Sequence, residues 1–497
     1  MKRILILIAL LGIVLTGCEK QTTSQDVPES GPTPEQSVET VQGKWMALSK
    51  EHKDRSGQDL KQYDPATDDV PAIIIEDGNF FTAVVKAATE VMLKDPDSSE
   101  ISLNEDGKLV CQLGYDRYGL ISYELRLEQD KLIVIQTYSE NDEITDTFIY
   151  GRSDFPVKTL PSDLSKNESA NCYIVSEPGN YCFSTFYKGN GNKEQIAGST
   201  TPLLDNIVSA EVYFEEYPTV EEEAPFIPNT VLKNVRYEDH YIYFSTAEPF
   251  QEGNVLIAAK DASGETVWSW HIWVTDQPEE RVYANNAGIL MDRNLGAWHN
   301  TTPDEYSLYL ALGFLYQWGR KDALLHPSDE YINIAATYSY PSMVSVETIG
   351  DGIAYTTKHP DVFVETDAFQ TFPAWCGTVD PEQAMKLWTA EKTIYDPCPP
   401  GWRVPDAIWA KSGFTDTKSS YFYGYMMPAS ISGKDSWYPS LYCSSPSGNN
   451  LSQGQYLTVT RVPDKNAVKV LNVFTSEVVL TQTDIANGAF VRCKKIL

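Results

Sequence analysis

The sequence predicts a multi-domain protein in which two β-rich domains are followed by an α+β domain. Its 497 residues are too many for one ordinary hydrophobic core. Short strand-like runs separated by Asp-Gly, Pro-Gly and Ser-Gly turns occupy the first part of the chain, whereas helix-start signals occur only after about residue 289. We therefore expect domains at residues 43–152, 154–277 and 283–497, preceded by a leader and a tether.

Residues 1–18 are predicted to be a lipoprotein signal peptide. A basic pair, Lys2 and Arg3, precedes the apolar run 4–14, which is too short to be a comfortable membrane span. The run ends in Leu15-Thr16-Gly17-Cys18, which resembles a bacterial lipobox, although an ordinary signal peptide with an incidental cysteine is the alternative. The resemblance implies lipid attachment at Cys18 and an outer-membrane location in the cell envelope, with the periplasmic and the external face both left open.

Residues 19–42 are rich in Ser, Thr, Gln and Pro and contain almost nothing apolar. Such a segment cannot offset its ordering entropy by burial, so we expect a flexible tether. The formal net charge of −30 argues against a nucleic acid or an anionic membrane surface as partner, because their phosphate groups would repel the chain. We expect contact with a membrane through the lipid anchor only.

The cysteines fit an oxidising compartment. No two of them are spaced as C-x-x-C, and the six histidines form no cluster with them, so zinc and thioredoxin-type chemistry are poorly supported. We expect no metal and no cofactor. The number of cysteines besides Cys18 is odd, so at least one should be unpaired. They are Cys111, Cys172, Cys182, Cys376, Cys398, Cys443 and Cys493.

Residues 43–152 are predicted to form a β-meander or small barrel. The segments 76–79 and 105–108 each contain Asp-Gly between strand-like runs, which is a strong hairpin signal because these residues accept positive φ. The opening Gly43-Lys44-Trp45 and the closing Tyr150-Gly151-Arg152, together with the two turns, resemble the lipocalin-like domains of Bacteroidota lipoproteins. That resemblance implies no particular ligand.

Residues 154–277 are predicted to form a β-sandwich-like domain. Pro178-Gly179 is a type II turn signature between two strands, and we expect Asn171–Phe183 to fold back on itself as a hairpin. In that hairpin Cys172 and Cys182 would be offset by about 10 Å, which is too far for a disulfide. These two cysteines should therefore not pair.

The strand at 265–275 alternates two sets of side chains. Trp268, Trp270, Ile272 and Val274 share one face, and Val267, Ser269, His271 and Trp273 share the other. A tryptophan-lined sugar site is one interpretation, but a sandwich core is favoured because large aromatic residues are mostly buried, and His271 is expected to be structural rather than a base. The blocks 170–183 and 253–276 resemble a sequence common in surface and fimbria-associated lipoproteins of Bacteroidota.

The last segment contains helix signals and long loops. Asp380-Pro381 is typical of a helix N-terminus, so we expect a helix over 380–388, and a second short one over 406–411. Four ordered motifs resemble the Fibrobacter succinogenes major paralogous domain, which implies a C-type-lectin-like architecture in a surface-attached protein but no activity. These motifs are Met291–Ala297 (MDRNLGA), Phe314–Asp322 (FLYQWGRKD), Tyr395–Pro405 (YDPCPPGWRVP) and Phe490–Cys493 (FVRC).

Cys398 lies among three prolines in the third of these motifs. Neither a helix N-terminus nor a nearby histidine is available to lower its pKa, so a nucleophilic role is not supported. The family resemblance implies a disulfide with Cys493. Such a bond would close a loop of roughly 95 residues and contribute about 4 kcal/mol in the chain-entropy interpretation.

No common enzyme motif occurs, and the tripeptides that bind calcium in sugar-binding lectins are missing. A carbohydrate-active enzyme with two facing carboxylates remains open. An aromatic-rich region supplies candidate ligand-binding residues, because flat rings stack on sugars beside carboxylates and amides; the alternative is that these rings fill a core. The candidates are Tyr423, Asp435, Trp437, Tyr438, Asn449 and Asn450.

The leading functional hypothesis is a lipid-anchored, non-catalytic module that acts as an adhesin or binds a glycan or a cell-surface protein. The first alternative is a fimbrial or pilus assembly component, such as a tip subunit, with fimbrial subunits as partners. The second alternative is a carbohydrate-active enzyme.

Overall fold

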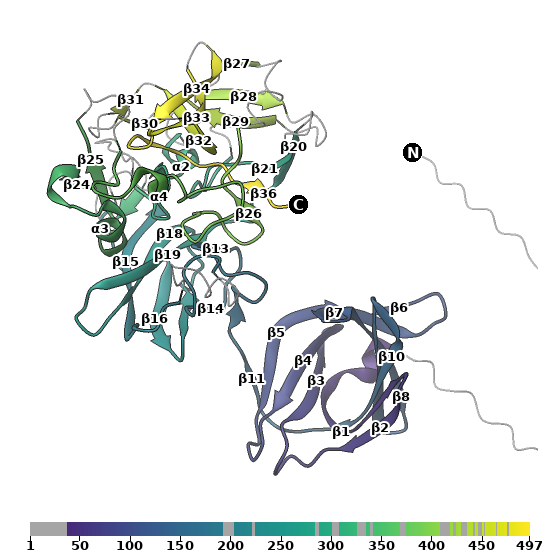
Figure 1. Ribbon diagram of the computed structural model, residues 1–497. Coiled ribbons are helices and arrows are strands. Elements are labelled where there is room, and N and C mark those ends of the chain that lie inside the picture. Colours follow the sequence, from purple (N-terminus) through teal and green to yellow (C-terminus); the bar gives the residue numbers. More distant parts are fainter. Residues whose placement is uncertain are drawn as a thin grey trace, which may run out of the picture. The chain divides into compact units, whose positions relative to one another are not determined.

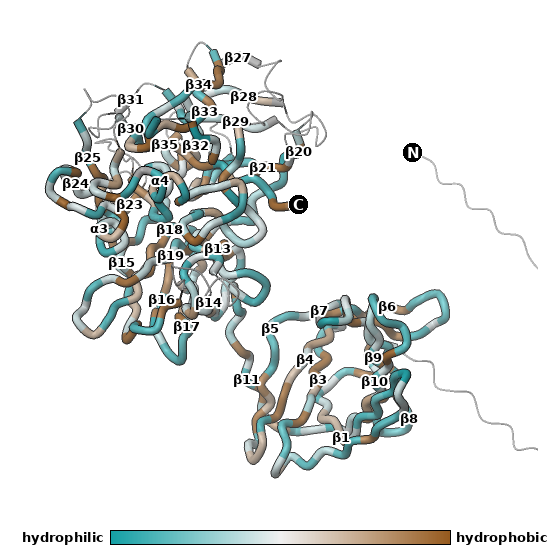
Figure 2. The backbone as a smooth tube through the Cα atoms, in the orientation of Figure 1, coloured by the Kyte–Doolittle hydropathy of each residue, from teal (hydrophilic) through white to brown (hydrophobic). Residues whose placement is uncertain are grey.

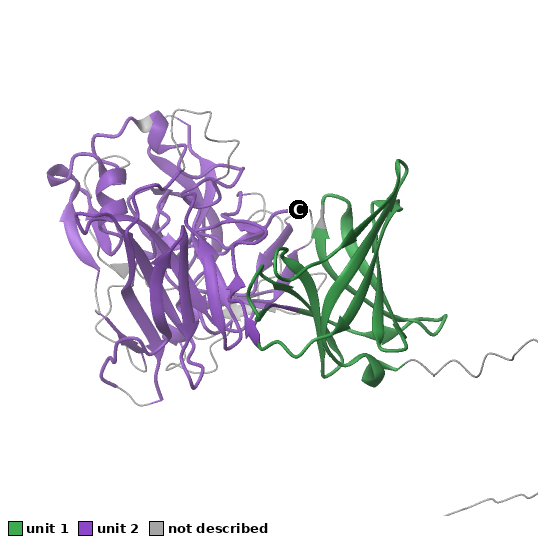
Figure 3. Ribbon diagram, turned by 90° about the horizontal axis from the view of Figure 1, so that it is seen from below, with its two compact units in different colours: residues 1–92, 98–156 green, residues 93–97, 157–497 purple. Residues whose placement is uncertain are grey.

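A computed structural model describes most of the chain after residue 36. The described residues are 37–191, 203–220, 224–283, 288–300, 308–325, 334–337, 341–367, 374–407, 418–420, 424–428, 435–440, 443–445, 450–451, 453–463, 465–474 and 477–497. The predicted signal peptide and Cys18 lie outside them. The chain divides into two compact units, residues 1–92 with 98–156 and residues 93–97 with 157–497 (Figure 3). Both units are built mainly of β-strands, as predicted.

The first unit is one large sheet that curls around its own core (Figure 1). The order of its strands is β5-β4-β3-β1-β10-β9-β8-β7-β6, with β2 beside β1. Residues 38–41, which the sequence assigned to the tether, form the short helix α1 (Val38–Val41), and Val41 is buried. The strands are β1 (Gly43–Asp54), β2 (Gly57–Gln62), β3 (Val70–Glu76), β4 (Asn79–Val85), β5 (Met92–Glu100), β6 (Ser102–Leu103), β7 (Leu109–Asp116), β8 (Gly119–Glu128), β9 (Lys131–Tyr138) and β10 (Asn141–Arg152).

The predicted hairpin at 76–79 is confirmed. Glu76 pairs with Asn79, and the two turn residues Asp77 and Gly78 have φ of 49° and 79°. A two-residue turn with positive φ matches the twist of the strands it joins. The alternating residues of these strands then meet in one cluster around the fully buried Trp45.

In the second unit, two sheets form a sandwich around a shared core. The predicted hairpin over 171–183 is wrong, because β13 runs parallel to β19 in one sheet whereas β14 pairs with β17 in the other. The Pro178-Gly179 segment thus connects the two sheets of the sandwich. Cys172 and Cys182 are both buried, and neither forms a disulfide. One sheet contains β12 (Ser162–Asp163), β14 (Asn180–Ser184), β17 (Tyr241–Thr246) and β16 (Leu232–Glu238); the other contains β13 (Cys172–Val175), β19 (Thr266–Val274), β18 (Gly253–Lys260), β15 (Ser209–Pro218) and β23 (Ile334–Ala336).

The five-stranded sheet is covered on both faces. Trp268 and Trp270 pack into the sandwich core, whereas Trp273 packs into a second cluster with residues from the C-terminal part of the chain. Figure 2 shows the continuous hydrophobic stretch along β18 that such two-sided burial requires. The prediction that these tryptophans form a core is therefore confirmed.

The remaining chain is also mostly β-structure, with short helices. The helix predicted over 380–388 begins at Asp380, whose carboxylate accepts from the Glu382 N–H, but α4 ends already at Ala384. Of the helix predicted over 406–411, residues 408–411 lie outside the described part, and Asp406 and Ala407 are not helical. The described helical elements of this region are α2 (Leu308–Leu312), η2 (Val346–Thr348), α3 (Gly352–Lys358) and α4 (Pro381–Ala384).

The strands of this region form several small sheets and one larger one. The larger sheet has the order β31-β30-β35-β32-β33-β34, with β22 beside β35. The strands are β20 (Glu280–Tyr283), β21 (Gly288–Met291), β22 (Leu315–Gln317), β24 (Ser342–Ser345), β25 (Val362–Glu365), β26 (Trp402–Arg403), β27 (Lys418–Ser420), β28 (Gly424–Pro428), β29 (Asp435–Pro439), β30 (Cys443–Ser444), β31 (Asn450–Leu451), β32 (Gly454–Arg461), β33 (Ala467–Val473), β34 (Val478–Asp484), β35 (Gly488–Phe490) and β36 (Lys494–Lys495). The short strand β11 (Val157–Thr159), which precedes the sandwich, pairs with β5.

Candidate functional site

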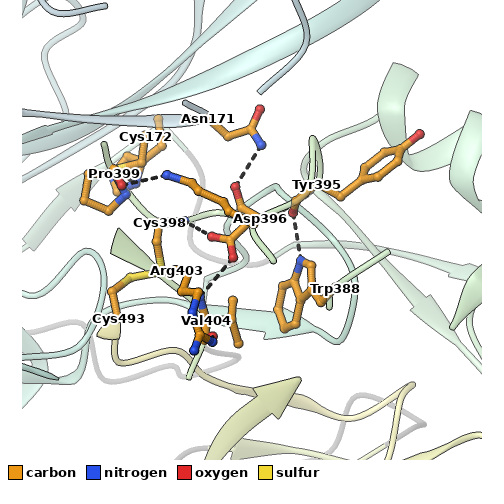
Figure 4. The surroundings of a disulfide bond; sticks show 12 residues. Asn171, Cys172, Trp388, Tyr395, Asp396, Cys398, Pro399, Arg403, Val404 and Cys493 are labelled. Atoms are coloured by element: carbon orange, nitrogen blue, oxygen red, sulfur yellow. Dashed lines mark hydrogen bonds between the residues drawn. A yellow bond between two sulfur atoms is a disulfide. The ribbon is translucent and has the colours of Figure 1, made fainter. Parts of the chain in front are cut away.

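The motif around Cys398 is structural. Cys398 forms a disulfide with Cys493, as the resemblance implied (Figure 4). The buried Asp396 carboxylate accepts hydrogen bonds from the N–H groups of Cys398 and Val404 at 2.9 Å each. Burial raises the pKa of Asp396 to about 6, although these bonds and nearby cations oppose the shift. The Asn171 amide, next to β13, donates to the Asp396 carbonyl at 2.9 Å, so the motif also fastens the sandwich to the C-terminal region.

The two central candidate ligand residues are part of the core. Trp437 and Tyr438 are 1% and 0% exposed. The Arg492 guanidinium lies 3.7 Å from the centre of the Tyr438 ring, and the Tyr438 hydroxyl lies 3.0 Å from that of Tyr283. A sugar cannot reach rings covered in this way, so the hypothesis of a recognition surface around them is corrected to the core alternative. The side chains of Asp435 and Asn450, and the whole of Tyr423 and Asn449, lie outside the described part of the chain.

A series of buried, hydrogen-bonded polar side chains contains the residue types of a cysteine-protease site. The pKa values of its cysteine and histidine, however, shift in the directions opposite to those of a protease's catalytic pair. Cys172 Sγ lies 3.5 Å from His271 Nδ1, His271 Nε2 lies 2.9 Å from Asn254 Oδ1, and Asn254 Nδ2 donates to Glu216 at 2.9 Å. Burial raises the pKa of the Cys172 thiol, lowers the pKa of His271 to about 3 and raises the pKa of Glu216 to about 8. All four residues are buried, so a substrate cannot reach them, and the shifts run opposite to those of an activated thiolate and imidazolium; the arrangement is that of a structural network.

A groove of about 700 Å³ lies where the sandwich meets the C-terminal region. We call it the junction groove. Its lining comes from Lys188, the loop 203–206, the β18–β19 turn with the start of β19 (Asp261 and 265–268), the helix α3 with its capping Asp351, and Tyr395. Figure 1 shows α3 close to the sandwich strands. Its volume is within the range of small-ligand sites, which often form where domains meet.

The floor of the junction groove is aromatic and rigidly held. The Trp268 ring is fully buried, and its Nε1 donates to Asn171 Oδ1 at 2.9 Å. Its centre lies 5.7 Å from the centre of the half-buried Tyr395 ring. The Tyr395 carbonyl is fixed by a 2.8 Å hydrogen bond from Trp388 Nε1. Only the Tyr395 ring is partly exposed, so it offers the groove a preformed aromatic surface at little entropic cost, with the buried Trp268 indole packed behind it.

The walls of the junction groove are charged. Lys358 on α3 pairs with Glu265 of the sandwich at 2.7 Å and so joins the two walls. The other two wall carboxylates already serve the backbone: Asp261 Oδ1 accepts from Glu265 N at 3.1 Å, and Asp351 Oδ1 accepts from Ala354 N at 2.9 Å as the cap of α3. The loop carboxylate of Asp205 is exposed. The walls thus combine acceptors, donors and one ion pair that spans the groove.

A glycine-rich loop positions Lys188 in this groove. Gly189 has φ of 49°, and a Cβ there would lie 2.3 Å from the Ile394 carbonyl oxygen, so only glycine allows the loop to approach this closely. Asn190 then donates to the Lys392 carbonyl at 2.8 Å. The sequence candidates for ligand binding did not include this loop. The sequence shows a glycine at position 189. It does not show that glycine is required there, because that requirement comes from the contact with the Ile394 carbonyl, about two hundred residues away.

The first unit has a separate concavity of about 620 Å³ over β7, β8 and β9. Strand register and alternation place Gln112, Ser122 and Glu124 on the face opposite to Cys111 and Tyr123, which belong to the core. The concavity is therefore formed mainly by the polar outer face of the sheet. None of the described residues that line it on that face is aromatic.

A second polar cluster in the first unit depends on a β-bulge. The extra residue between Ala47 and Ser49 shifts the alternation of β1, so that Lys50 and His52 share the face of Asp146. Asp146 accepts from the Tyr138 hydroxyl and from His52 Nδ1 at 2.6 Å each. Burial opposes ionisation of Asp146, but hydrogen bonds from Tyr138, His52 and Lys50 outweigh it and lower its pKa. This carboxylate is fully engaged and is a structural group.

Two further tests concern membranes and metals. No helix in the described part of the chain is long and apolar enough to cross a bilayer. Within the same residues, no group of three or more His, Cys, Asp or Glu side chains is arranged to hold a metal ion.

Comparisons with known proteins give little. No family model matches the chain. No curated protein matches it either. Among solved structures, the chain is similar to the fluorescent protein UnaG, with 18% sequence identity over 24% of this chain and 100% of that chain and a TM-score of 0.15.

Proposed function

We propose that this is a lipid-anchored cell-envelope protein that binds a glycan in the junction groove without chemical conversion. Cys18 would carry the lipid, and residues 19–36 would serve as a spacer. Residues 43–152 would be a lipocalin-like domain and residues 283–497 a C-type-lectin-like domain, as their motifs suggest. In this proposal the recognition site is made jointly by the sandwich and the C-terminal region.

The observation that carries the proposal is the combination of the half-buried Tyr395 ring with polar walls in one preformed groove. A sugar offers an apolar ring face and a rim of hydroxyl groups. Aromatic rings bind the former, and carboxylates, amides and ammonium groups bind the latter.

Binding rather than catalysis is supported by the state of the wall carboxylates. Asp261 and Asp351 each accept a backbone hydrogen bond, and Glu265 is paired with Lys358. A glycosidase needs one carboxylate that acts as acid and another that acts as base or nucleophile. These three carboxylates instead hold a turn, a helix end and the two walls, which leaves Asp205 as the fourth described carboxylate of the groove, and one carboxylate does not supply both functions.

The test is a glycan-array screen of the full-length protein in a non-glycosidic detergent, repeated with a variant that carries Asp205→Asn and Glu265→Gln. Both side chains line the groove. The variant should lose at least about tenfold in affinity for every glycan that the unaltered protein binds. The matched control is Glu238→Gln, an exposed carboxylate on β16 outside the groove.

Two results would contradict the proposal. One is the absence of binding on a broad array, which would shift the weight to a protein partner. The other is a bound glycan whose affinity the Asp205 and Glu265 substitutions leave unchanged, because the site would then lie elsewhere. Release of a new reducing end from a bound glycan would replace binding by hydrolysis.

A further inference from the structure

Lys188 carries an ammonium group that has no counter-charge among the described residues. Its Nζ lies 5.3 Å from the centre of the Trp268 ring and lines the junction groove. No carboxylate of the described residues lies within 4.0 Å of it. Burial lowers its pKa, which means that removing water from the ammonium is not fully compensated. A charge in this state is stabilised by any anion that enters the groove.

Lys321 beside the same indole shows how the chain treats a structural lysine. Its Nζ lies 4.5 Å from the centre of the Trp268 ring. It is 5% exposed and is paired with the Asp322 carboxylate. The other two lysines of this region also have partners, since Lys392 pairs with Glu168 at 3.3 Å and Lys358 with Glu265 at 2.7 Å. Lys188 is the exception within the described part of the groove, and it faces the groove.

The lysine is also held in place from behind. Gly189, the next residue, packs against the Ile394 carbonyl, and Gly191 N donates to the Lys188 carbonyl at 2.9 Å. The side chain therefore extends from a fixed backbone over a fixed ring. An ammonium that is already positioned loses less entropy on binding than one on a mobile chain.

We propose that Lys188 binds the carboxylate of an acidic saccharide, such as a uronic acid, in the junction groove. This inference rests on the proposed function and names its ligand class. A carboxylate beside Lys188 would form a charge-assisted hydrogen bond in a partly dehydrated site. The wall carboxylates of Asp205 and Asp261 would repel further negative charge, so the groove selects one acidic sugar flanked by neutral ones over a polyanion.

The test uses pairs of oligosaccharides that differ only in one group, a uronic acid carboxylate against the hydroxymethyl group of the parent hexose; cellobiouronic acid and cellobiose are one such pair. Both members of each pair are titrated calorimetrically into the full-length protein and into its Lys188→Gln variant. The acidic member should bind about tenfold more tightly to the unaltered protein, and Lys188→Gln should reduce this preference to about one.

Two variants serve as controls. Lys386→Gln, at an exposed lysine outside the groove, should keep the preference for the acidic member, and Lys188→Arg should keep most of it, because both preserve a cation over Trp268. Thermal unfolding checks that Lys188→Gln is folded. If it is not, Lys188→Met, which keeps the stem of the side chain, replaces it.

The outcomes separate the two proposals. Equal affinity for both members of every bound pair, or a preference that Lys188→Gln leaves unchanged, overturns the inference while glycan binding in the groove stands. A loss of about tenfold or more in affinity in the Asp205→Asn, Glu265→Gln variant, with the preference gone in Lys188→Gln, supports both. If no oligosaccharide binds at all, both proposals fall.

Discussion

Two aromatic regions of the second unit, residues 435–438 and 395–405, lie in surroundings opposite to those that their compositions suggest. The segment 435–438, with its acid, tryptophan and tyrosine, has the composition of a sugar site, yet Trp437 and Tyr438 are sealed in the core beneath Arg492. The motif at 395–405, with its prolines and disulfide, has the composition of a staple, yet its first residue, Tyr395, lines the junction groove. Composition predicted the chemistry that each segment could perform. It did not predict which segment solvent can reach.

The difference lies in how the polar partners are supplied. In the core region the chain provides most of them: Arg492 Nη2 donates to the Trp437 carbonyl at 2.8 Å and Arg492 Nε donates to Asn294 Oδ1 at 3.0 Å, while Arg492 Nη1 has no hydrogen-bond partner among the described residues. In the junction groove the Lys188 ammonium has no carboxylate partner among the described residues, and the Tyr395 ring is partly exposed. The proposed ligand rests on this partly exposed ammonium at the groove, whereas the polar groups of the core region face only protein. Substitutions should therefore cost stability in the first region and binding in the second.

The largest effect is expected from Trp437→Ala. Removing a fully buried indole leaves a cavity, and the free energy of unfolding should fall by about 3–5 kcal/mol. Urea unfolding monitored by circular dichroism measures the change, with Trp437→Phe as the matched variant that should lose less. Glycan affinity of the folded fraction should stay within about twofold. A loss of stability below about 1 kcal/mol, or a selective loss of binding, would return this segment to the surface.

The second prediction concerns the buried carboxyl of Glu216. Burial raises its pKa from 4.5 to about 8, so between these values the folded state holds a proton that the unfolded state has lost. The contribution of Glu216 to stability therefore falls as the pH rises from 4.5 to 8. A glutamine side chain at this position does not titrate and can keep the hydrogen bond from Asn254 Nδ2.

Relative to the unaltered protein, Glu216→Gln should thus become more stable with rising pH, by up to about 1.4 kcal/mol per pH unit across this window. Unfolding curves of both proteins at pH 5, 6, 7 and 8 give the difference in their free energies of unfolding. Groups that titrate in both proteins contribute equally and do not affect this difference. Glu238→Gln on the exposed β16 should show no such trend. A flat difference for Glu216→Gln would mean that solvent reaches this carboxyl.

The smallest effect is expected for the ion pair that spans the junction groove. Lys358 and Glu265 are about half exposed, and such pairs contribute roughly 0.2–1 kcal/mol. A double-mutant cycle with Lys358→Gln and Glu265→Gln should give a coupling energy in that range, and 0.5 M salt should reduce it. A coupling above about 2 kcal/mol would show that the walls are locked together and that the groove is part of the structural core.

Several features could be predicted from the sequence because they depend on neighbouring residues. The turn at Asp77-Gly78 needs only residues that accept positive φ. The alternation of Trp268 and Trp270 along β19 needs only the period of a strand. The Cys398–Cys493 disulfide came from a family resemblance, and the pairing is present.

Other predictions failed because they depend on distant residues. The turn at Pro178-Gly179 was expected to fold the chain back, but whether a strand pairs with its predecessor or crosses to another sheet depends on what it can bury there. The helix from Asp380 was expected to continue to 388. Its start depends on a local cap, whereas its end was decided by packing, with Leu387 and Trp388 buried in non-helical chain.

By itself, the sequence determined the β-rich, multi-domain architecture, the local turns and a set of aromatic and polar candidate residues, of which Trp437 and Tyr438 are buried. Only the tertiary structure decided which of those residues reach solvent, because exposure is a property of what packs on top. Lys188, Trp268 and Tyr395 are more than 70 residues apart in sequence from one to the next, and each has a conventional local explanation. They become a groove only because Gly189 allows one backbone to approach another that lies roughly two hundred residues away.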